Sequence, residues 1–234
     1  MSKPDPRPQL AQRSAILQAA AGLIAAEGYH GMTMRSLAKA TGRSLAAVYN
    51  YYGSKEEILF ALQKEAFETL IAAADGALHD VGDPEARLYV FISHHVHYFA
   101  AHPDVMRVLV HEAASLPPPR RRVVRELKER YFRIARDIVQ ASREAGAFEE
   151  PAEADLERVT YSLFGMLNWI YGWYEPDRHG SPHEVARTIH RIALAGLLAD
   201  GGPLQGLQST MDQHLASLAA PPLLGSADLR GQTP

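Results

Sequence analysis

The sequence predicts an all-α protein with a small N-terminal three-helix domain and a larger C-terminal helical domain. Apolar residues recur at the three- and four-residue spacing of amphipathic helices along most of the chain. We find no segment with the alternating pattern of a β-strand. Serine and threonine precede several of the periodic segments, and glycine or proline follows them, which is the pattern of capped helices joined by turns.

The composition of the 234-residue chain is that of an ordinary soluble globular protein, with 47% hydrophobic and 22% charged residues. The chain contains no cysteine, which excludes a disulfide framework and a thiolate metal site. The sequence contains no run of about 18 apolar residues, so we expect no membrane-spanning helix. The opening stretch MSKPDPRPQLAQR lacks the apolar core of a signal peptide. We therefore expect a cytoplasmic protein without a membrane partner.

Charge is unevenly distributed along the chain. The net charge is −3, yet residues 1–55 carry seven basic and two acidic side chains, a balance of +5. The remaining residues therefore carry −8. A basic N-terminal segment followed by an acidic remainder is typical of a protein with a nucleic-acid-binding module.

The N-terminal part predicts an arm followed by two helices. Residues 1–9 contain three prolines and predict a disordered arm. Apolar residues at helical spacing predict a first helix from about Leu10 to Glu27, which Gly28 ends. Thr33 is the expected N-cap of a short second helix. The Thr41-Gly42 pair ends that helix.

Two more capping residues define the end of this domain. Ser44 is the expected N-cap of a third helix that runs from Leu45 to Tyr52. Ser54 is the expected N-cap of a fourth helix, and Glu57, three positions later, completes a capping box. We place the N-terminal domain at residues 10–55.

The rest of the chain predicts a helical domain at residues 56–200 and a tail. After the fourth helix, apolar periodicity predicts helices at 84–101, 103–115, 118–146, 153–175 and 182–200. Prolines near these boundaries fit helix starts and positions just past helix ends. Residues 201–234 are rich in Gly, Pro, Leu and Ser and predict a mostly flexible tail. Within this tail, 204–218 have the spacing of one more amphipathic helix.

The second and third predicted helices have the arrangement of a helix-turn-helix, because a tight glycine-containing turn joins them behind a supporting first helix. Val48 and Tyr52 are four residues apart and are expected to pack inward. Asn50 and Tyr51 then face outward with hydrogen-bonding groups for base edges or phosphates. Tyr49 lies at the flank, within reach of a phosphate. The third helix is therefore the expected recognition helix.

Lys55 stands at the first position of the fourth predicted helix, where the helix dipole favours acidic residues. A DNA phosphate at this helix N-terminus would use both the free amide groups and the lysine. The alternative is a solvated surface lysine. The surrounding pattern favours the phosphate contact.

The stretch from about Ile16 to Leu59 resembles the N-terminal DNA-binding domain of the TetR family of repressors. The residues that carry the resemblance are Gly28-Tyr29, Thr33, Arg35, Leu37-Ala38, Gly42, Ser44, Val48-Tyr49, Tyr52 and Ser54-Lys55. The family usually has glycine at the position of Ala46 and phenylalanine at that of Tyr52. Neither departure threatens the fold, but Ala46 puts the base contacts in doubt.

The resemblance implies an N-terminal helix-turn-helix DNA-binding domain and a C-terminal helical ligand-binding and dimerisation domain. The implied DNA-binding residues are Thr33, Ser44, Tyr49, Tyr51 and Lys55 at phosphates, Arg43, Leu45, Ala46 and Asn50 nearest the bases, and Arg35. The implied homodimer uses helices near 153–175 and 182–200 and binds double-stranded DNA at a palindromic operator. The protein is expected to be a ligand-responsive repressor without a cofactor, and not an enzyme.

Aromatic residues concentrate in residues 161–174, which include both tryptophans of the chain. One interpretation is a core and dimer interface, where such side chains dominate. The other is an apolar cavity for a small-molecule effector. The candidate pocket residues are Tyr89, His94, Tyr98, Tyr131, Phe164, Asn168, Trp169 and Trp173.

The run NWIYGWYEPDRHGSPHEVA, residues 168–186, carries a second resemblance. It is similar to the equivalent helix end in the TetR branch that governs fatty-acid, phenylacetate and steroid catabolism and senses acyl-coenzyme A thioesters. Such an effector implies an apolar channel for the acyl chain and basic groups for the phosphates. Arg120, Arg121 and Arg122 are candidates for the phosphates, and the alternative is a solvated helix start.

Two other functions stay open at this point. A multidrug-sensing repressor would share the fold, and buried glutamates beside the aromatic residues would favour it. A helical enzyme would use the segment His94–His111, but no nucleophile motif, paired carboxylates or phosphate loop supports it. His94, His95 and His97 do not predict a metal site, because 94 and 95 point about 100° apart on a helix and no nearby acid completes the set.

Overall fold

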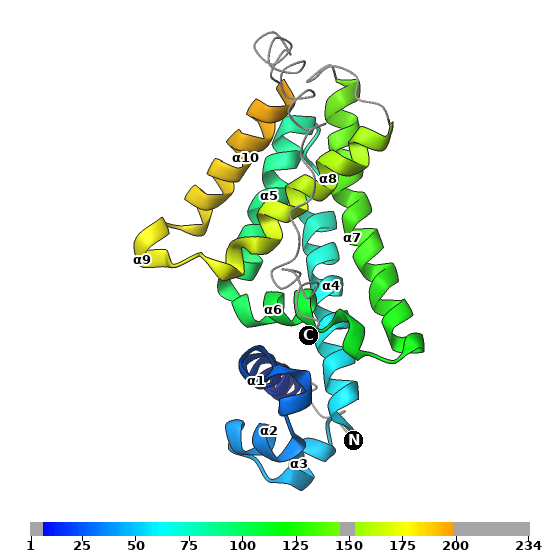
Figure 1. Cartoon of the computed structure of the whole chain (residues 1–234), viewed down its shortest axis with the longest axis vertical. Helices are drawn as coiled ribbons and strands as arrows, with labels where there is room; N and C mark the ends of the chain where they lie inside the picture. The colour runs from blue at the N-terminus through cyan, green and yellow to red at the C-terminus, as the bar shows by residue number, and fades with distance from the viewer. Residues whose placement is uncertain (1–6, 146–152, 199–234) are drawn as a thin grey trace, which may run out of the picture. The chain divides into compact units, whose positions relative to one another are not determined.

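The computed structural model describes residues 7–145 and 153–198, and these residues form helices joined by turns, without a strand (Figure 1). This confirms the all-α prediction. The α-helices are α1 (Arg7–Gly31), α2 (Met34–Ala40), α3 (Leu45–Tyr49), α4 (Lys55–Leu78), α5 (Pro84–Ala101), α6 (Pro103–His111), α7 (Pro118–Glu144), α8 (Glu153–Asn168), α9 (Pro176–His179) and α10 (Pro182–Leu198). Two 3₁₀ turns, η1 (Ala113–Ser115) and η2 (Trp169–Gly172), follow α6 and α8.

Helix α1 differs from its prediction at both ends. It begins at Arg7, inside the stretch predicted to be a disordered arm. Pro8 does not prevent this, because an amide hydrogen is not needed in the first turn of a helix. At the other end, Gly28 adopts φ 74° and breaks the helical path, as predicted, and one further turn reaches Gly31. A positive φ of this kind strains any residue with a side chain, which explains the glycine.

Three predicted helices are shorter in the structure. Helix α3 ends at Tyr49 with Asn50 as its C-cap, so the recognition helix is three residues shorter than predicted. The predicted helix 103–115 divides into α6 and η1 at Glu112, and 153–175 divides into α8 and η2 at Trp169. Gly172 and Pro176, at and after the end of η2, both disfavour a continuous α-helix. The predicted tail at 201–234, with its helix at 204–218, lies outside the described residues.

Side-chain caps fix the starts of the short N-terminal helices. The Thr33 and Ser36 side chains form a reciprocal capping box at α2. The hydroxyl of Ser44 accepts the Ala47 amide at 3.1 Å, as predicted for the start of α3. Ser54 likewise accepts the amide of Glu57. The Glu57 carboxylate reaches the amide of Gly53 at 2.8 Å instead of that of Ser54, so this capping box closes one residue earlier than predicted.

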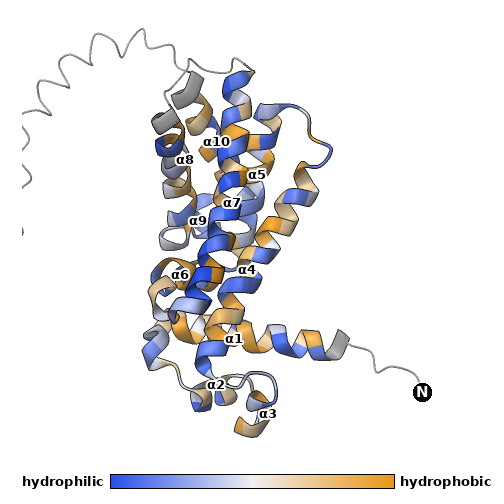
Figure 2. Cartoon of the chain, turned by 90° about the vertical axis from the view of Figure 1, so that its right-hand side faces the viewer, coloured by the Kyte–Doolittle hydropathy of each residue, from blue (hydrophilic) through white to orange (hydrophobic). Residues whose placement is uncertain are grey.

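Helix α4 links the N-terminal helices to the body. It packs on α1, α5 and α7. Buried residues of α4 run from Ile58 to Leu78 and belong to one core cluster with residues of α1, α5 and α7. Figure 2 shows apolar and polar residues on each of the long helices, as expected when one side of a helix packs on the core. The helix-turn-helix is therefore attached to the body through a shared apolar core.

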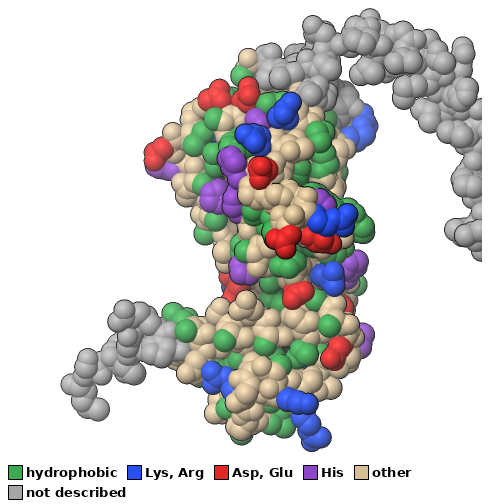
Figure 3. Space-filling model, turned by 90° about the vertical axis from the view of Figure 1, so that its left-hand side faces the viewer, with side chains coloured by type: hydrophobic (Ala, Val, Ile, Leu, Met, Phe, Trp, Pro, Cys, Tyr) green, Lys and Arg blue, Asp and Glu red, His purple; other side chains and the backbone are tan. Residues whose placement is uncertain are grey.

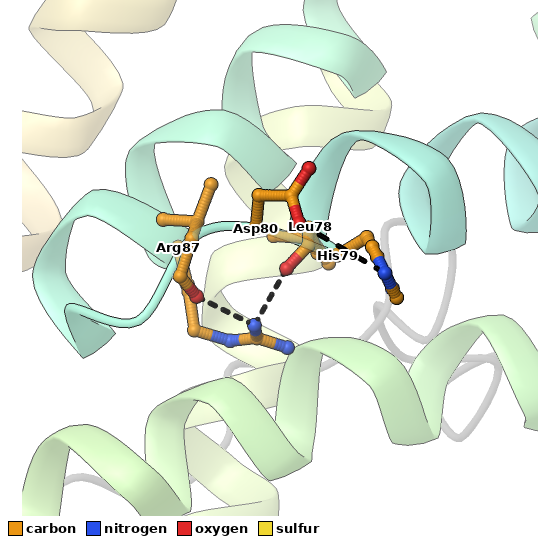
Figure 4. A network of polar contacts seen from close by, with 5 residues as sticks. Leu78, His79, Asp80 and Arg87 are labelled. Atoms are coloured by element: carbon orange, nitrogen blue, oxygen red, sulfur yellow. Dashed lines mark hydrogen bonds and ion pairs between the residues drawn. The ribbon is translucent and has the colours of Figure 1, made fainter.

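The turn between α4 and α5 is held by one arginine. The Arg87 guanidinium donates to the backbone oxygens of Leu78 at 2.8 Å and Val81 at 2.9 Å (Figure 4). The Leu78 carbonyl lies at the end of α4 and also accepts the Val81 amide, and the Val81 carbonyl lies in the turn itself, so Arg87 ties the helix end to the turn. The nearby pair of His79 and Asp80 is exposed and 3.9 Å apart, so it contributes little.

Candidate nucleic-acid interface and ligand cavity

Helices α2 and α3 present most of the predicted DNA-binding residues to solvent. Val48 and Tyr52 are buried beneath them, which confirms that these two side chains pack inward. The exposed members of the predicted set are Thr33, Arg35, Ser44, Leu45, Ala46, Tyr49 and Asn50, and the half-buried members are Arg43, Tyr51 and Lys55. Leu45 is 37% exposed and Tyr49 47% exposed. A short helix that exposes such side chains is suited to contact a partner.

The surface of this helix pair is basic. Residues 28–55 contain two arginines and two lysines and no aspartate or glutamate. On the face drawn in Figure 3, lysine and arginine side chains lie at the end that holds these helices, and both basic and acidic side chains lie above them. A region with this balance attracts a polyanion such as the DNA backbone.

Tyr51 is partly engaged inside the domain. Its hydroxyl hydrogen-bonds to the side-chain oxygen of Gln12 on α1, and the guanidinium of Arg43 lies 5.9 Å from the centre of its ring. These contacts fix the turn after α3 against α1. The predicted phosphate contact of Tyr51 stays a prediction.

Lys55 has a role in the structure that the sequence did not indicate. Its ammonium donates to the backbone oxygens of Tyr29 and His30 at 3.3 Å and of Met32 at 3.4 Å, and it lies 4.7 Å from the centre of the Tyr29 ring. The broken end of α1 at Gly28 presents these carbonyls, and a cation is favourable there. This explains a lysine at the start of α4 without DNA, and the predicted phosphate contact stays a prediction.

Glu112 joins the end of α6 to α1, the helix that supports the helix-turn-helix. Its carboxylate accepts the backbone amide of Tyr29 at 3.0 Å and also accepts the hydroxyl of Ser115. Its backbone oxygen accepts the side-chain amide of Gln63, which is buried on α4. Three helices therefore meet at one glutamate.

An apolar cavity of about 430 Å³ lies between α4, α5, α6, α7, α8 and η2. Four of the predicted pocket residues line it: Tyr131, Phe164, Asn168 and Trp169. Its other walls are mainly apolar and aromatic, including Phe67 and Phe99. The exposed Lys128 of α7 is the cationic residue of its lining, and no acidic residue of the described chain lines it.

The other four predicted pocket residues lie elsewhere. Tyr89 hydrogen-bonds to His183 at 3.0 Å and joins α5 to α10. Tyr98 packs on Phe99 and His102 outside this lining. Trp173 lines a second hollow. The histidine on the cavity wall is His95, and its neighbour His94 is exposed. Consecutive residues of a helix point about 100° apart, so the two side chains cannot share one face.

His95 is buried on the wall of this cavity. Its Nδ1 lies 3.2 Å from the hydroxyl of Tyr131, and its Nε2 has no partner among the described residues. Burial lowers the pKa of His95 to about 3, so the imidazole is neutral. The sequence held a signal for it: Phe91, His95 and Phe99 are spaced by four residues and share the buried face of α5.

The lowered pKa predicts acid sensitivity. The unfolded chain binds a proton at His95 below about pH 6.5 and the folded chain does not, so stability is complete above that pH and falls towards pH 3. Between pH 7 and pH 5 we expect wild type to lose about 2 kcal/mol more unfolding free energy than His95→Phe. Urea unfolding at both pH values measures this. Equal losses would contradict a neutral buried imidazole.

A second apolar surface covers α8, η2 and α10. Its most exposed large residues are Tyr161 at 63%, Trp169 at 61% and Ile192 at 55%. A hollow of about 790 Å³, lined also by Trp173 and Ile189, lies within it. Apolar patches of this kind mark protein contacts. The surface coincides with the helices predicted to form the dimer interface.

None of the helices in the described residues has the length and apolarity needed to cross a lipid bilayer. Within the same residues, no three histidine, cysteine or acidic side chains are grouped for a metal ion.

Family models match most of the chain. Residues 16–62 match the model described as "Bacterial regulatory proteins, tetR family". Residues 81–197 match "Tetracyclin repressor-like, C-terminal domain". The first match contains the helix-turn-helix, and the second contains most of the cavity and the apolar surface.

Several individual proteins are similar to this chain along most of their own length. The TetR family transcriptional regulator PfmR from Thermus thermophilus is 35% identical, with a TM-score of 0.70 over 78% of this chain and 98% of its own. The fatty acid metabolism regulator protein of Bacillus subtilis is 23% identical over 78% of this chain and 93% of its own. AibR, solved with isovaleryl coenzyme A and operator DNA, is 24% identical with a TM-score of 0.67 over 77% of this chain and 97% of its own.

Proposed function

The chain belongs to the TetR family of bacterial transcriptional regulators, which are DNA-binding proteins and not enzymes, and from this premise we propose that its effector is an acyl-coenzyme A thioester. The family assignment makes the chain a ligand-responsive transcriptional repressor.

The observation that carries the effector proposal is an apolar cavity with one cation in its lining. An acyl group suits the aromatic and aliphatic walls, and Lys128 is exposed where the cavity meets solvent. An ammonium there suits the anionic part of a thioester. A fatty-acid regulator and a protein solved with isovaleryl coenzyme A are among the similar proteins, which supports the same class.

The charges of the cavity also separate this proposal from its alternatives. A pocket for cationic drugs needs acidic groups, and no acidic side chain of the described residues lines the cavity. Two arginines proposed for the phosphates have other partners: Arg120 pairs with Glu56 at 3.0 Å, and Arg121 donates to the backbone oxygen of Leu116. Lys128 is therefore the better candidate for the anionic group.

The DNA-bound form is proposed to be a homodimer in the cytoplasm. Two copies meet through the apolar surface of α8, η2 and α10, and each places α3 in the major groove of one half of a palindrome, about 34 Å apart or more. Arg43, Leu45, Ala46 and Asn50 lie nearest the bases, and Thr33, Ser44, Tyr49, Tyr51 and Lys55 contact phosphates. Arg35 is a further DNA-binding residue.

Release is proposed to pass through α6. Met106 and Leu109 of α6 line the cavity, and Glu112 at the end of the same helix holds the Tyr29 amide of α1. A ligand that displaces α6 therefore changes the position of the helix-turn-helix. A coupling free energy of about 1–3 kcal/mol is enough to change DNA affinity by about 5- to 150-fold.

The experiment is fluorescence anisotropy on DNA from upstream of the protein's own gene, titrated with coenzyme A thioesters of different acyl groups and with the free acids. Release by one thioester and not by its acid supports the proposal, and the acyl group identifies the pathway. Bound DNA that no thioester releases would overturn the effector class and leave the repressor assignment intact.

Lys55→Ala tests the phosphate contact. If Lys55 contacts phosphate, the substitution lowers affinity for all DNA sequences about equally and reduces the slope of log affinity against log salt by about one per subunit. Anisotropy at several salt concentrations measures the slope. Glu129→Ala, on the exposed side of α7, is the control and should not change it. An unchanged slope with lower thermal stability would assign Lys55 to the α1 carbonyls alone.

A further inference from the structure

The imidazole of His95 is one of several buried polar side chains of the described residues that have an unpaired atom, and it is the one among them that lines the cavity. It is 2% exposed, and only its Nδ1 has a hydrogen-bond partner among the described residues. Buried polar atoms in folded proteins are nearly always paired, and an unpaired one indicates a bound water or ligand. His95 lines the 430 Å³ cavity, so that cavity is the place from which a partner can come.

The surroundings favour one position of the proton on the imidazole. If Tyr131 donates its hydroxyl proton to Nδ1, then Nε2 carries the ring proton and one buried group, the Nε2–H, lacks a partner. In the other arrangement Nδ1–H donates to Tyr131. Both the Tyr131 proton and the Nε2 lone pair then need partners. The first arrangement leaves fewer unpaired groups and is favoured.

The surroundings also exclude a charged partner at this position. The rings of Phe99, Tyr131 and Phe164 lie 4.7, 5.9 and 5.9 Å from the imidazole centre. No acidic residue lines the cavity among the described residues, and its lining lysine is exposed. An ion this deep among aromatic rings would be poorly solvated, whereas a carbonyl oxygen needs only one donor.

We propose that the Nε2–H of His95 donates a hydrogen bond to an uncharged acceptor oxygen on the buried part of the ligand. The protein then selects ligands with a carbonyl-type oxygen over hydrocarbon groups of the same shape. The oxygen is either that of the thioester or one further along the acyl group. The inference rests on the proposed function in taking the cavity as the effector site, and it does not require coenzyme A.

The test uses two small probes, 4-phenylcyclohexanone and phenylcyclohexane, which differ by a carbonyl group in place of one ring methylene. Calorimetry gives the dissociation constant of each for the full-length protein, and the ratio of the two removes the effect of their common skeleton. In His95→Phe, which keeps an aromatic ring of similar size, the ratio should shift against the ketone by about tenfold, as expected for one buried hydrogen bond. His94→Phe, one residue earlier and exposed, should leave it unchanged.

Two measurements keep the test decisive if His95→Phe folds poorly. Binding of the hydrocarbon probe to the variant reports an intact cavity. On wild type, the ¹⁵N shift of His95 Nε2 should move with the ketone and stay fixed with the hydrocarbon. An unchanged ratio in a folded variant, a fixed Nε2 shift, or no binding of either probe to wild type would each overturn the inference.

Thioester titrations separate this inference from the effector proposal. Pairs of thioesters of equal chain length, with and without a 3-oxo group, distinguish the two sources of the oxygen. A His95-dependent preference for the 3-oxo member places the bonded oxygen on the acyl group. Equal His95 dependence of both members places it on the thioester. If no thioester releases DNA and the ketone still depends on His95, the effector class is wrong and the role of His95 stands.

Discussion

Replacement of Ile192 by arginine is expected to convert the protein to a monomer and to lower its affinity for operator DNA by at least about 100-fold. Ile192 lies on α10 with 55% of its surface exposed, and it lines the same hollow as Trp169 and Trp173. In a twofold dimer each copy contributes this residue, so one substitution places two unpaired charges in the interface. A monomer then presents one recognition helix where the palindrome requires two.

Sedimentation velocity and DNA anisotropy measure the two effects. Val123→Arg is the matched control, because Val123 is an exposed valine of α7 that does not line this hollow. It should remain dimeric and bind DNA normally. An Ile192→Arg protein that stays dimeric would show that two copies associate through another surface. A monomer with unchanged DNA affinity would contradict the paired recognition helices.

Glu112→Ala is expected to separate effector binding from DNA release. The substitution leaves the Tyr29 amide without its acceptor at the contact between α6 and α1. Loss of this charge-assisted hydrogen bond should lower the unfolding free energy by about 2 kcal/mol. The effector should bind the cavity with little change, and its effect on DNA affinity should fall about tenfold.

Calorimetry of effector binding and anisotropy of DNA release measure these quantities on the same protein. Glu112→Gln keeps an acceptor oxygen and should retain most of the response. Glu129→Ala removes an exposed glutamate of α7 and should have no effect on either quantity. Full DNA release by Glu112→Ala would mean that the signal reaches the helix-turn-helix by another route, such as α4.

Local signals explain why the order of helices could be predicted. Thr33, Ser44 and Ser54 each cap a helix as expected, since capping depends on residues within one turn. The inward pair Val48 and Tyr52 followed from spacing alone. The helix ends at Tyr49 and Asn168 were missed because tertiary contacts and nearby turn residues decide where a helix stops.

Long-range contacts explain what could not be predicted. Lys55 was interpreted as a phosphate ligand, and its observed carbonyl partners are more than 20 residues earlier in the chain. Of the predicted pocket residues, Tyr131, Phe164, Asn168 and Trp169 line the cavity, and each is aromatic or stands next to an aromatic residue in the sequence. The pocket prediction contained His94 and not His95, although the four-residue spacing of Phe91, His95 and Phe99 is a local signal for the buried face of α5. No local pattern marks Glu112 as a contact of α1.

The shared core along α4 sets where this protein can be recombined with its relatives. A junction at residue 55, the predicted domain boundary, would separate Ile58, Leu59 and Leu62 from the α1 residues of the same core cluster. A chimera built there would expose apolar surface on both fragments and would need new partners for Lys55 and Glu112. A hybrid sensor with a new operator specificity is better made by exchanging surface residues of α2 and α3, which leaves every contact between the two parts in place.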